Sequence, residues 1–214
     1  MGTIRNNIIK ICKELHLRGW IASCDGNVSY KKSDNSIYIT PKGVHKGYLE
    51  ISQMSKITLS GNIIYGKPST ERLMHLAIYK NSVRAKAIVH AHPPYATAWS
   101  IAHPELEFLP INCLSEGILA IGSIPMISYA RPGSQEMGTN LLPYLEKSQV
   151  YILKNHGAIS WGENLQEAYN GMERLEHLAK ILFFSTQLGG MYELPHEELD
   201  FLWKKRKDGD QRIY

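Results

Sequence analysis

The sequence predicts an α/β protein in which a mixed, mainly antiparallel sheet is covered by helices. Segments with the apolar spacing of a helix alternate with short strand-like runs along the whole chain. Several of these runs are joined by short turns, and hairpins of this kind pair strands antiparallel. The 214 residues contain no linker, repeat or low-complexity segment, so residues 1–214 are expected to form a single domain.

The first half of the chain is expected to contain a helix, a strand, a hairpin and a second helix. Residues 4–17 place apolar side chains at helical spacing, and a glycine follows them as a stop signal. Residues 37–40 have the composition of a strand. Residues 56–59 and 63–65 flank a Ser-Gly-Asn turn and predict a hairpin. Residues 69–80 predict a short helix.

Strands and helices continue to alternate in the second half. Residues 85–92 and 124–129 predict strands, and residues 95–102 predict a helix that follows the first of them. Residues 134–142 predict a further helix, which Pro143 disturbs because proline cannot continue a helix.

The remaining chain predicts two strands and a long helix. Residues 150–153 and 158–161 are expected to be strands that meet at a turn. Asn164 is expected to cap the helix, with Glu167 at its third position, because short polar side chains accept hydrogen bonds from the free N–H groups there. The helix is expected to end at Gly-Gly, residues 189–190.

Composition indicates a globular protein of the cytoplasm. Apolar residues make up 43% of the chain and charged residues 21%, and no apolar run is long enough to span a membrane. The first residues lack the apolar core of a signal peptide, and the three cysteines are odd in number and widely spaced, which favours a reducing compartment. The net charge of +4 is mild and no nucleic-acid motif is present, so neither a membrane nor a nucleic acid is expected as a partner.

Three histidines form the most informative pattern of the chain. His90 and His92 alternate along a predicted strand, so their side chains point to the same face, and His156 follows in a later turn. Three imidazoles with an open fourth position are typical of catalytic Zn²⁺, which can polarise a carbonyl and stabilise the enolate beside it. Paired histidines on a strand are also common as ordinary surface or core residues, so both interpretations stay open on local grounds.

Three short segments are candidates for binding an anion. They are Gly-Asn-Val-Ser at 26–29, Thr-Pro-Lys-Gly at 40–43 and Pro-Ser-Thr-Glu at 68–71. The third directly precedes a predicted helix, whose free N–H groups and dipole favour a phosphate. Taken alone, Ser69 is equally a plain helix cap, and Gly26-Asn27 a plain turn.

Glu71 has two interpretations. Placed in the first turn of the predicted helix, its carboxylate favours the helix dipole. Placed beside a metal, it is a candidate general base. Glu71 and His75 are four residues apart on the predicted helix, so a salt bridge or hydrogen bond between them is expected rather than a second metal site.

The order and spacing of these pieces resemble the class II aldolase/adducin family over nearly the whole chain. The motifs that carry the resemblance are Gly-Asn-Val-Ser at 26–29, Ile-Thr-Pro-Lys-Gly at 39–43, Pro-Ser-Thr-Glu at 68–71, Val-His-Ala-His at 89–92 and Asn-His-Gly at 155–157. The resemblance implies a three-layer α/β/α fold with a central, mainly antiparallel sheet. It implies a homotetramer whose active sites lie at subunit interfaces, partly closed by a C-terminal tail. Residues from about 204, which end in Tyr214, are expected to form this mobile tail.

The resemblance also implies roles for the candidate residues. It makes one Zn²⁺ per subunit the cofactor, with the ligands His90, His92 and His156. It implies that the substrate phosphate is held by Asn27, Gly43, Ser69 and Thr70. Glu71 would be the acid/base and can also ligate the metal when no substrate is bound. The implied reaction cleaves a small ketose 1-phosphate to dihydroxyacetone phosphate and an aldehyde through a metal-stabilised enediolate.

One segment departs from the family pattern. The best-known aldolase of the family protonates the aldehyde oxygen with a tyrosine from the neighbouring subunit, and the corresponding residues here, about 111–116, include no tyrosine. Family dehydratases use a glutamate in this segment, which makes Glu116 a candidate second acid/base, with an ordinary surface glutamate as the alternative. A dehydratase or decarboxylase acting on a phosphorylated sugar or sugar acid therefore stays open. An epimerase is disfavoured, because family epimerases carry aspartate where this chain has Glu71.

A non-enzymatic alternative also follows from the resemblance. Adducin head domains share the fold and act as cytoskeletal interaction modules. The complete set of three histidines together with Glu71 argues against this alternative, because an interaction module has no use for a metal site.

Overall fold

The structure is a computed structural model that describes residues 3–208, and its eight strands form one sheet in the order β4-β3-β2-β1-β5-β8-β7-β6. Neighbouring strands run antiparallel except β6 and β7, which run parallel. The strands are β1 (Asn27–Lys31), β2 (Ser36–Ile39), β3 (Ser55–Thr58), β4 (Ile63–Tyr65), β5 (Ala87–Ala91), β6 (Met126–Ile127), β7 (Val150–Leu153) and β8 (Gly157–Gly162). The mainly antiparallel sheet predicted from the sequence is confirmed.

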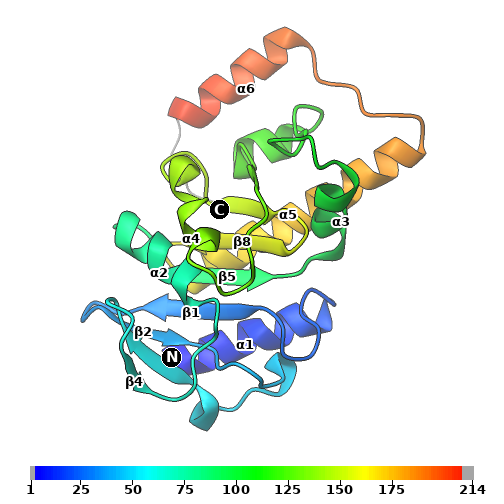
Figure 1. Cartoon of the computed structure of the whole chain (residues 1–214). Coiled ribbons are helices and arrows are strands. Elements are labelled where there is room, and N and C mark those ends of the chain that lie inside the picture. Colours follow the sequence, from blue (N-terminus) through cyan, green and yellow to red (C-terminus); the bar gives the residue numbers. More distant parts are fainter. Residues whose placement is uncertain (1–2, 209–214) are drawn as a thin grey trace.

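Helices pack around this sheet (Figure 1). The α-helices are α1 (Ile4–Leu17), α2 (Arg72–Asn81), α3 (Pro94–Ala102), α4 (Glu136–Thr139), α5 (Leu165–Gln187) and α6 (His196–Asp208). The shorter turns are η1 (Lys46–Tyr48), η2 (Ile51–Gln53), η3 (Gly117–Ile121) and η4 (Leu142–Tyr144). Within residues 3–208, no helix combines the length and apolar character needed to cross a membrane.

Alternation along the strands divides the hydrophobic core between the two faces of the sheet. On β5, Val89 belongs to the cluster that includes residues of α1 and α5, whereas Ile88 belongs to the cluster that includes residues of α2 and α4. All five residues of β5 are buried, because this central strand is covered on both faces. The expected α/β/α layering is therefore present, and it places His90 of β5 inside the molecule.

Several elements match the expectations from the sequence. α1 spans the expected residues, and β3 and β4 form the expected hairpin. The carboxamide oxygen of Asn164 accepts a hydrogen bond from the Glu167 N–H at 2.9 Å, which caps α5 as predicted.

The start of α2 differs from the expectation. The helix predicted from Ser69 begins at Arg72, with Glu71 as its N-cap residue. Pro68 pairs with Pro41, and the Ser69 N–H donates to the Thr40 carbonyl at 3.1 Å. Residues 68–69 therefore continue sheet-like pairing instead of entering the helix, and this pairing brings two of the candidate anion-binding segments together.

Three further predictions of secondary structure were wrong in part. The turn suggested at Gly26-Asn27 leads directly into strand β1, whose residues the sequence analysis did not assign to a strand. The strand predicted over 124–129 is limited to the two residues of β6. The helix predicted over 134–142 is divided into α4 and η4, because Pro143 cannot continue α4 and instead lies in the first turn of η4.

Residues 204–208 are not part of a mobile tail, although such a tail is expected from residue 204. Residues 204–208 complete α6, a helix that the sequence analysis did not predict. Leu202 is buried against the core, and the Arg206 guanidinium donates hydrogen bonds of 2.6 Å to the carbonyls of Leu119 and Ile121. These contacts hold α6 on η3. The rest of the expected tail, with Tyr214, lies outside the described residues.

Candidate metal centre and active site

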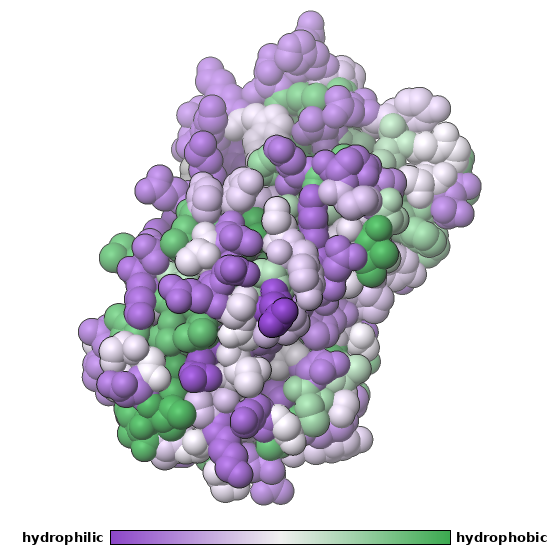
Figure 2. All heavy atoms as spheres, in the orientation of Figure 1, coloured by the Kyte–Doolittle hydropathy of each residue, from purple (hydrophilic) through white to green (hydrophobic). Residues whose placement is uncertain are grey.

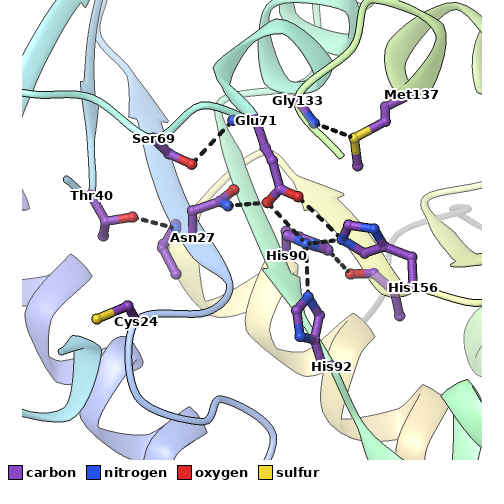
Figure 3. A network of polar contacts seen from close by, with 12 residues as sticks. Cys24, Asn27, Thr40, Ser69, Glu71, His90, His92, Gly133, Met137 and His156 are labelled. Carbon is purple, nitrogen blue, oxygen red and sulfur yellow. Dashed lines mark hydrogen bonds and ion pairs between the residues drawn. The ribbon is translucent and has the colours of Figure 1, made fainter. Parts of the chain in front are cut away.

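The side chains of three histidines converge at one point of the sheet (Figure 3). The Nε2 atom of His90 lies 3.3 Å from Nε2 of His92 and 3.1 Å from Nε2 of His156. One ligand atom from each residue lies within 4.8 Å of the other two. The structure therefore brings together the three histidines that the sequence singled out.

Local structure explains this convergence. His90 is on β5 and His92 directly follows that strand, so the two alternate residues face the same side, as predicted. The His92 N–H donates to the Trp20 carbonyl at 2.8 Å, which fixes the chain just beyond the strand. His156 lies in the tight turn between β7 and β8, next to Asn155 with a positive φ of 56°.

A backbone carbonyl sets the orientation and tautomer of His90. Its Nδ1 lies 2.8 Å from the Ala158 carbonyl oxygen, which can only accept, so Nδ1 carries the proton. The lone pair of Nε2 then faces the other two histidines. Metal-ligating histidines are commonly held this way. The sequence gives no signal for this contact, because it depends on the pairing of β5 with β8.

Glu71 completes the cluster with a carboxylate. Its Oε2 lies 3.2 Å from Nε2 of His90, and its Oε1 lies 3.2 Å from Nε2 of His156. Burial alone would raise the pKa of Glu71, but the adjacent imidazoles of His90 and His156 outweigh it and hold the pKa well below its usual range. Glu71 is therefore an ionised carboxylate that points at the histidines.

The expected contact between Glu71 and His75 is absent from the described residues. His75 instead places Nδ1 2.7 Å from the Ser29 hydroxyl oxygen, which also lies 2.7 Å from the Tyr79 hydroxyl. Burial is the main cause that lowers the pKa of His75 to about 3. His75 is thus a neutral, buried histidine behind the cluster.

The donor set fits a divalent metal ion. Three imidazole nitrogens and a carboxylate are ligands that Zn²⁺ prefers, and other divalent ions of the first transition row accept them too. Burial is the main cause that lowers the pKa of His92 to about 3, so this imidazole is neutral at neutral pH and offers a ring-nitrogen lone pair. A cation among these nitrogens would also relieve the close approach of their lone pairs.

Two of the four candidate phosphate residues surround Glu71. Asn27 opens β1 opposite His90, and its Nδ2 donates to Oε2 of Glu71 at 2.7 Å. The Ser69 hydroxyl oxygen accepts a hydrogen bond from the Glu71 N–H at 3.3 Å. Asn27 therefore orients the carboxylate, a role that the sequence analysis missed because it depends on the register between β1 and β5.

The other two candidate phosphate residues are exposed at the rim of the site. Thr70 precedes Glu71 and faces the turn at Gly133. Gly43 has a positive φ of 67°, with open space beside its Cα. A hydrogen bond of 3.0 Å from the Lys42 N–H to the Lys67 carbonyl holds the segment of Gly43 beside the segment that leads to Ser69.

Two glycines allow the chain to approach the histidines closely. A Cβ at Gly26 would lie 2.8 Å from the His90 carbonyl oxygen, and its φ of +63° is unfavourable for other residues. A Cβ at Gly157 would lie 2.6 Å from both the Ala91 carbonyl oxygen and the His92 ring. Glycine at these positions is therefore a condition for the observed geometry.

Glu116 is not brought to the histidines within one chain. It is exposed at the start of η3 and lines a cavity of about 730 Å³ that Trp20, Arg174 and Glu176 also border. None of the three histidines borders that cavity. Glu116 and the three histidines therefore do not line a common pocket in the described part of the chain.

The chain is similar to known proteins over most of its length. The profile described as "Class II Aldolase and Adducin N-terminal domain" matches residues 6–183. A 3-oxo-tetronate 4-phosphate decarboxylase from Escherichia coli O6:H1 is 36% identical over 85% of this chain and 86% of its own. An L-fuculose phosphate aldolase from Methanococcus maripaludis strain C5 is 39% identical over 86% of this chain and 98% of its own. The solved structure of an L-fuculose 1-phosphate aldolase superposes with a TM-score of 0.85 at 28% identity and covers 97% of both chains.

Proposed function

The chain belongs to the family of class II aldolases and adducin N-terminal domains, and we propose that it is a metal-dependent lyase that breaks a carbon–carbon bond in a small phosphorylated sugar or sugar acid. The observation that carries this proposal is the convergence of three imidazole nitrogens and the Glu71 carboxylate. A purely structural or interaction domain gains nothing from this arrangement, because it places polar groups in a buried part of the sheet.

Each residue of the site has a proposed task. His90, His92 and His156 would hold a Zn²⁺ or similar ion, which when bound polarises a carbonyl and stabilises negative charge beside it. Glu71 would transfer a proton at the carbon next to that carbonyl. Asn27 holds the Glu71 carboxylate in place through its 2.7 Å hydrogen bond. Asn27, Gly43, Ser69 and Thr70 would fix the substrate phosphate.

The first candidate reaction is the cleavage of a ketose 1-phosphate to dihydroxyacetone phosphate and an aldehyde. The relatives named L-fuculose phosphate aldolase support it. The bond that breaks leaves its electron pair on the carbon beside the carbonyl. The hydroxyl that becomes the aldehyde oxygen loses its proton in the same step. Glu71, which is ionised at rest, would take up a proton and deliver it to the carbon beside the carbonyl, and in the reverse direction it would remove one.

The second candidate is the decarboxylation of a phosphorylated 3-oxo sugar acid. The relatives named 3-oxo-tetronate 4-phosphate decarboxylase favour it. So does the absence of a tyrosine from residues 111–116, since release of CO₂ requires no protonation of an aldehyde oxygen. Both candidate reactions leave an electron pair beside a carbonyl, so one site supports either.

The proposal extends to assembly and location. The exposed position of Glu116 is consistent with a homotetramer in which a neighbouring subunit supplies the second acid/base. We also predict that the protein is cytoplasmic and that it binds neither a nucleic acid nor a membrane. The predicted native metal is Zn²⁺.

A substrate screen with product identification tests the function. Purified, metal-loaded protein would be incubated with ketose 1-phosphates and with phosphorylated sugar acids. Dihydroxyacetone phosphate identifies an aldolase, CO₂ a decarboxylase and a dehydrated product a dehydratase. Absence of stoichiometric metal together with absence of turnover would instead favour the adducin-like interaction module.

A further inference from the structure

Lys46 is the one buried lysine of residues 3–208. Figure 2 shows hydrophilic side chains over much of the visible face, and lysines usually lie in this surface layer. Lys46, in η1, is only 1% exposed, and its ammonium forms no ion pair with a carboxylate of the described residues. Burial of a cation without a counter-ion is costly, and a methionine would occupy a similar volume without that cost. The reason for a lysine here therefore lies in the hydrogen bonds that it makes.

Those hydrogen bonds join two separate segments of the chain. The Lys46 ammonium donates to the Cys24 carbonyl at 2.8 Å and to the Val44 carbonyl at 2.8 Å. The backbone N–H of Lys46 donates to the Ser23 carbonyl at 3.0 Å. Ser23 has a positive φ of 49°, which is uncommon for a residue other than glycine. One residue therefore fastens a locally unfavourable turn to the segment at Val44.

The turn belongs to a loop that touches two of the three histidines. We call residues 20–26 the support loop. At its start, the Trp20 carbonyl accepts a hydrogen bond from the His92 N–H at 2.8 Å. At its end, Gly26 lies so close to the His90 carbonyl oxygen that a Cβ would come within 2.8 Å of it. The support loop therefore braces the backbone of both histidines that β5 brings to the candidate metal centre.

Both segments that Lys46 joins also lead to Glu71. Asn27 follows the support loop directly, and its Nδ2 donates to Oε2 of Glu71 at 2.7 Å (Figure 3). Val44 follows the segment in which Pro41 pairs with Pro68, three residues before Glu71. A shift of either segment would therefore reach the Glu71 carboxylate or the chain that carries it.

We propose that Lys46 is a positioning residue of the metal centre: its buried ammonium fixes the support loop, and the loop sets the orientation of His92 and of the Glu71 carboxylate. This inference rests on the proposed function in taking the three histidines and Glu71 as the metal centre. Lys46 acts through backbone carbonyls, so no motif in the sequence indicates its role.

The test compares Lys46→Met with a matched control. Lys46→Met removes the charge and the N–H donors of the side chain and nearly keeps its volume. Arg206→Met is the control, because the half-buried Arg206 guanidinium also donates two hydrogen bonds to backbone carbonyls, and these hold α6 on η3, which carries none of the histidines. Three properties are measured: the melting temperature, the Zn²⁺ affinity in competition with a chelating dye, and the visible spectrum of bound Co²⁺, which reports the geometry of its ligands.

Lys46→Met is expected to bind Zn²⁺ about tenfold more weakly than the wild type, since groups that orient metal ligands typically contribute 10–100-fold to affinity and Lys46 acts at one further remove. Its Co²⁺ spectrum should change as well. Arg206→Met is expected to lose melting temperature to a similar degree while it keeps the wild-type Zn²⁺ affinity and Co²⁺ spectrum. Unchanged affinity and spectrum in Lys46→Met, or an equal weakening in both variants, would overturn the inference.

A second variant covers the case in which Lys46→Met does not fold. Lys46→Gln is neutral and one atom shorter, but it keeps an N–H donor that can reach one of the two carbonyls. It should also weaken Zn²⁺ binding relative to Arg206→Met, and wild-type affinity in Lys46→Gln would then count against the positioning role.

Turnover separates this inference from the proposed function. In a wild-type protein that cleaves a sugar phosphate, saturating Zn²⁺ should reload Lys46→Met without restoring its kcat, because the Asn27 contact with Glu71 stays displaced. Zn²⁺ affinity that depends on Lys46, in a protein that cleaves no phosphorylated compound, would refute the lyase and support the positioning role. A wild type that binds no divalent ion would refute both.

Discussion

Replacement of Glu71 by glutamine removes the proposed base and keeps the shape of the side chain. The structure makes the two possible roles of this residue separable. Its carboxylate makes no capping hydrogen bond to α2. Instead, Oε2 accepts from Asn27 at 2.7 Å, and the two oxygens face His90 and His156 at 3.2 Å. An interaction with the helix dipole is therefore a minor part of what Glu71 does.

The expected magnitudes follow from these contacts. A glutamine can keep its oxygen on Asn27 and turn its amide nitrogen towards His156. The structural loss is then one charge-assisted contact, or about 1.5–3 kcal/mol of stability. The loss of general acid/base catalysis is about 10²–10⁴-fold in kcat, which corresponds to about 3–5 kcal/mol in the barrier.

Three measurements on Glu71→Gln decide between the roles. We expect kcat to fall by the amount given above, metal content to stay near one ion per chain, and the melting temperature to fall modestly. Glu163→Gln is the matched control, because Glu163 is a carboxylate in a surface ion pair with Arg84 at 2.9 Å, and the full length of β8 separates it from His156. Near-wild-type turnover by fully metal-loaded Glu71→Gln would refute the assignment of Glu71 as the acid/base. Glu116 would then be the next candidate for that role.

Other perturbations test the metal, the phosphate residues and the buried histidine. A Cβ at Gly157 would lie 2.6 Å from the His92 ring, so Gly157→Ala is expected to displace His92 and lower metal content measured by elemental analysis. Removal of the metal with a chelator is expected to abolish turnover, and addition of Zn²⁺ or another divalent ion to restore it. Ser69→Ala is expected to raise KM about tenfold with little change in kcat, since one hydrogen bond to a charged group is lost; an unchanged KM would place phosphate recognition elsewhere. Burial is the main cause that lowers the pKa of His75 from 6.5 to about 3. At pH 7 this histidine is neutral in the folded and the unfolded chain, and below pH 6.5 only the unfolded chain gains a proton. Urea unfolding should therefore show stability falling by about 2 kcal/mol from this group between pH 7 and pH 5, and the fall should be smaller in His75→Gln.

The sequence predicts the site well wherever function depends on spacing within one segment. His90 and His92 point to the same side because alternate residues of a strand always do so. α5 begins where Asn164 predicts, because the capping contact is local. The fold class follows from the same local signals, because apolar residues repeat at a different spacing in helices than in strands.

Prediction failed where pairing between distant segments decided the outcome. Ser69 looks like a helix start in isolation, but its N–H donates to the Thr40 carbonyl in sheet-like pairing and α2 begins only at Arg72. The hydrogen bond from Asn27 to Glu71 depends on the register of β1 against β5 and on the placement of α2. Neither contact has a signal in the sequence, because each joins residues that are nearly thirty or more positions apart.

The role of Glu116 is a different case, because contacts within a single chain do not explain it. It lines a cavity that none of the histidines borders, whereas a group that transfers a proton must come within about 3 Å of the reacting atom or reach it through one water. If Glu116 is the second acid/base, we therefore expect another copy of the chain to carry it to the cluster. The hypothesis that Glu116 is the second acid/base therefore includes the hypothesis that the protein forms an oligomer. If a monomer turns over substrate, the second proton transfer must be made by a residue of the same chain. Asn27 would then be the first residue to substitute, because its Nδ2 lies 2.7 Å from the Glu71 carboxylate.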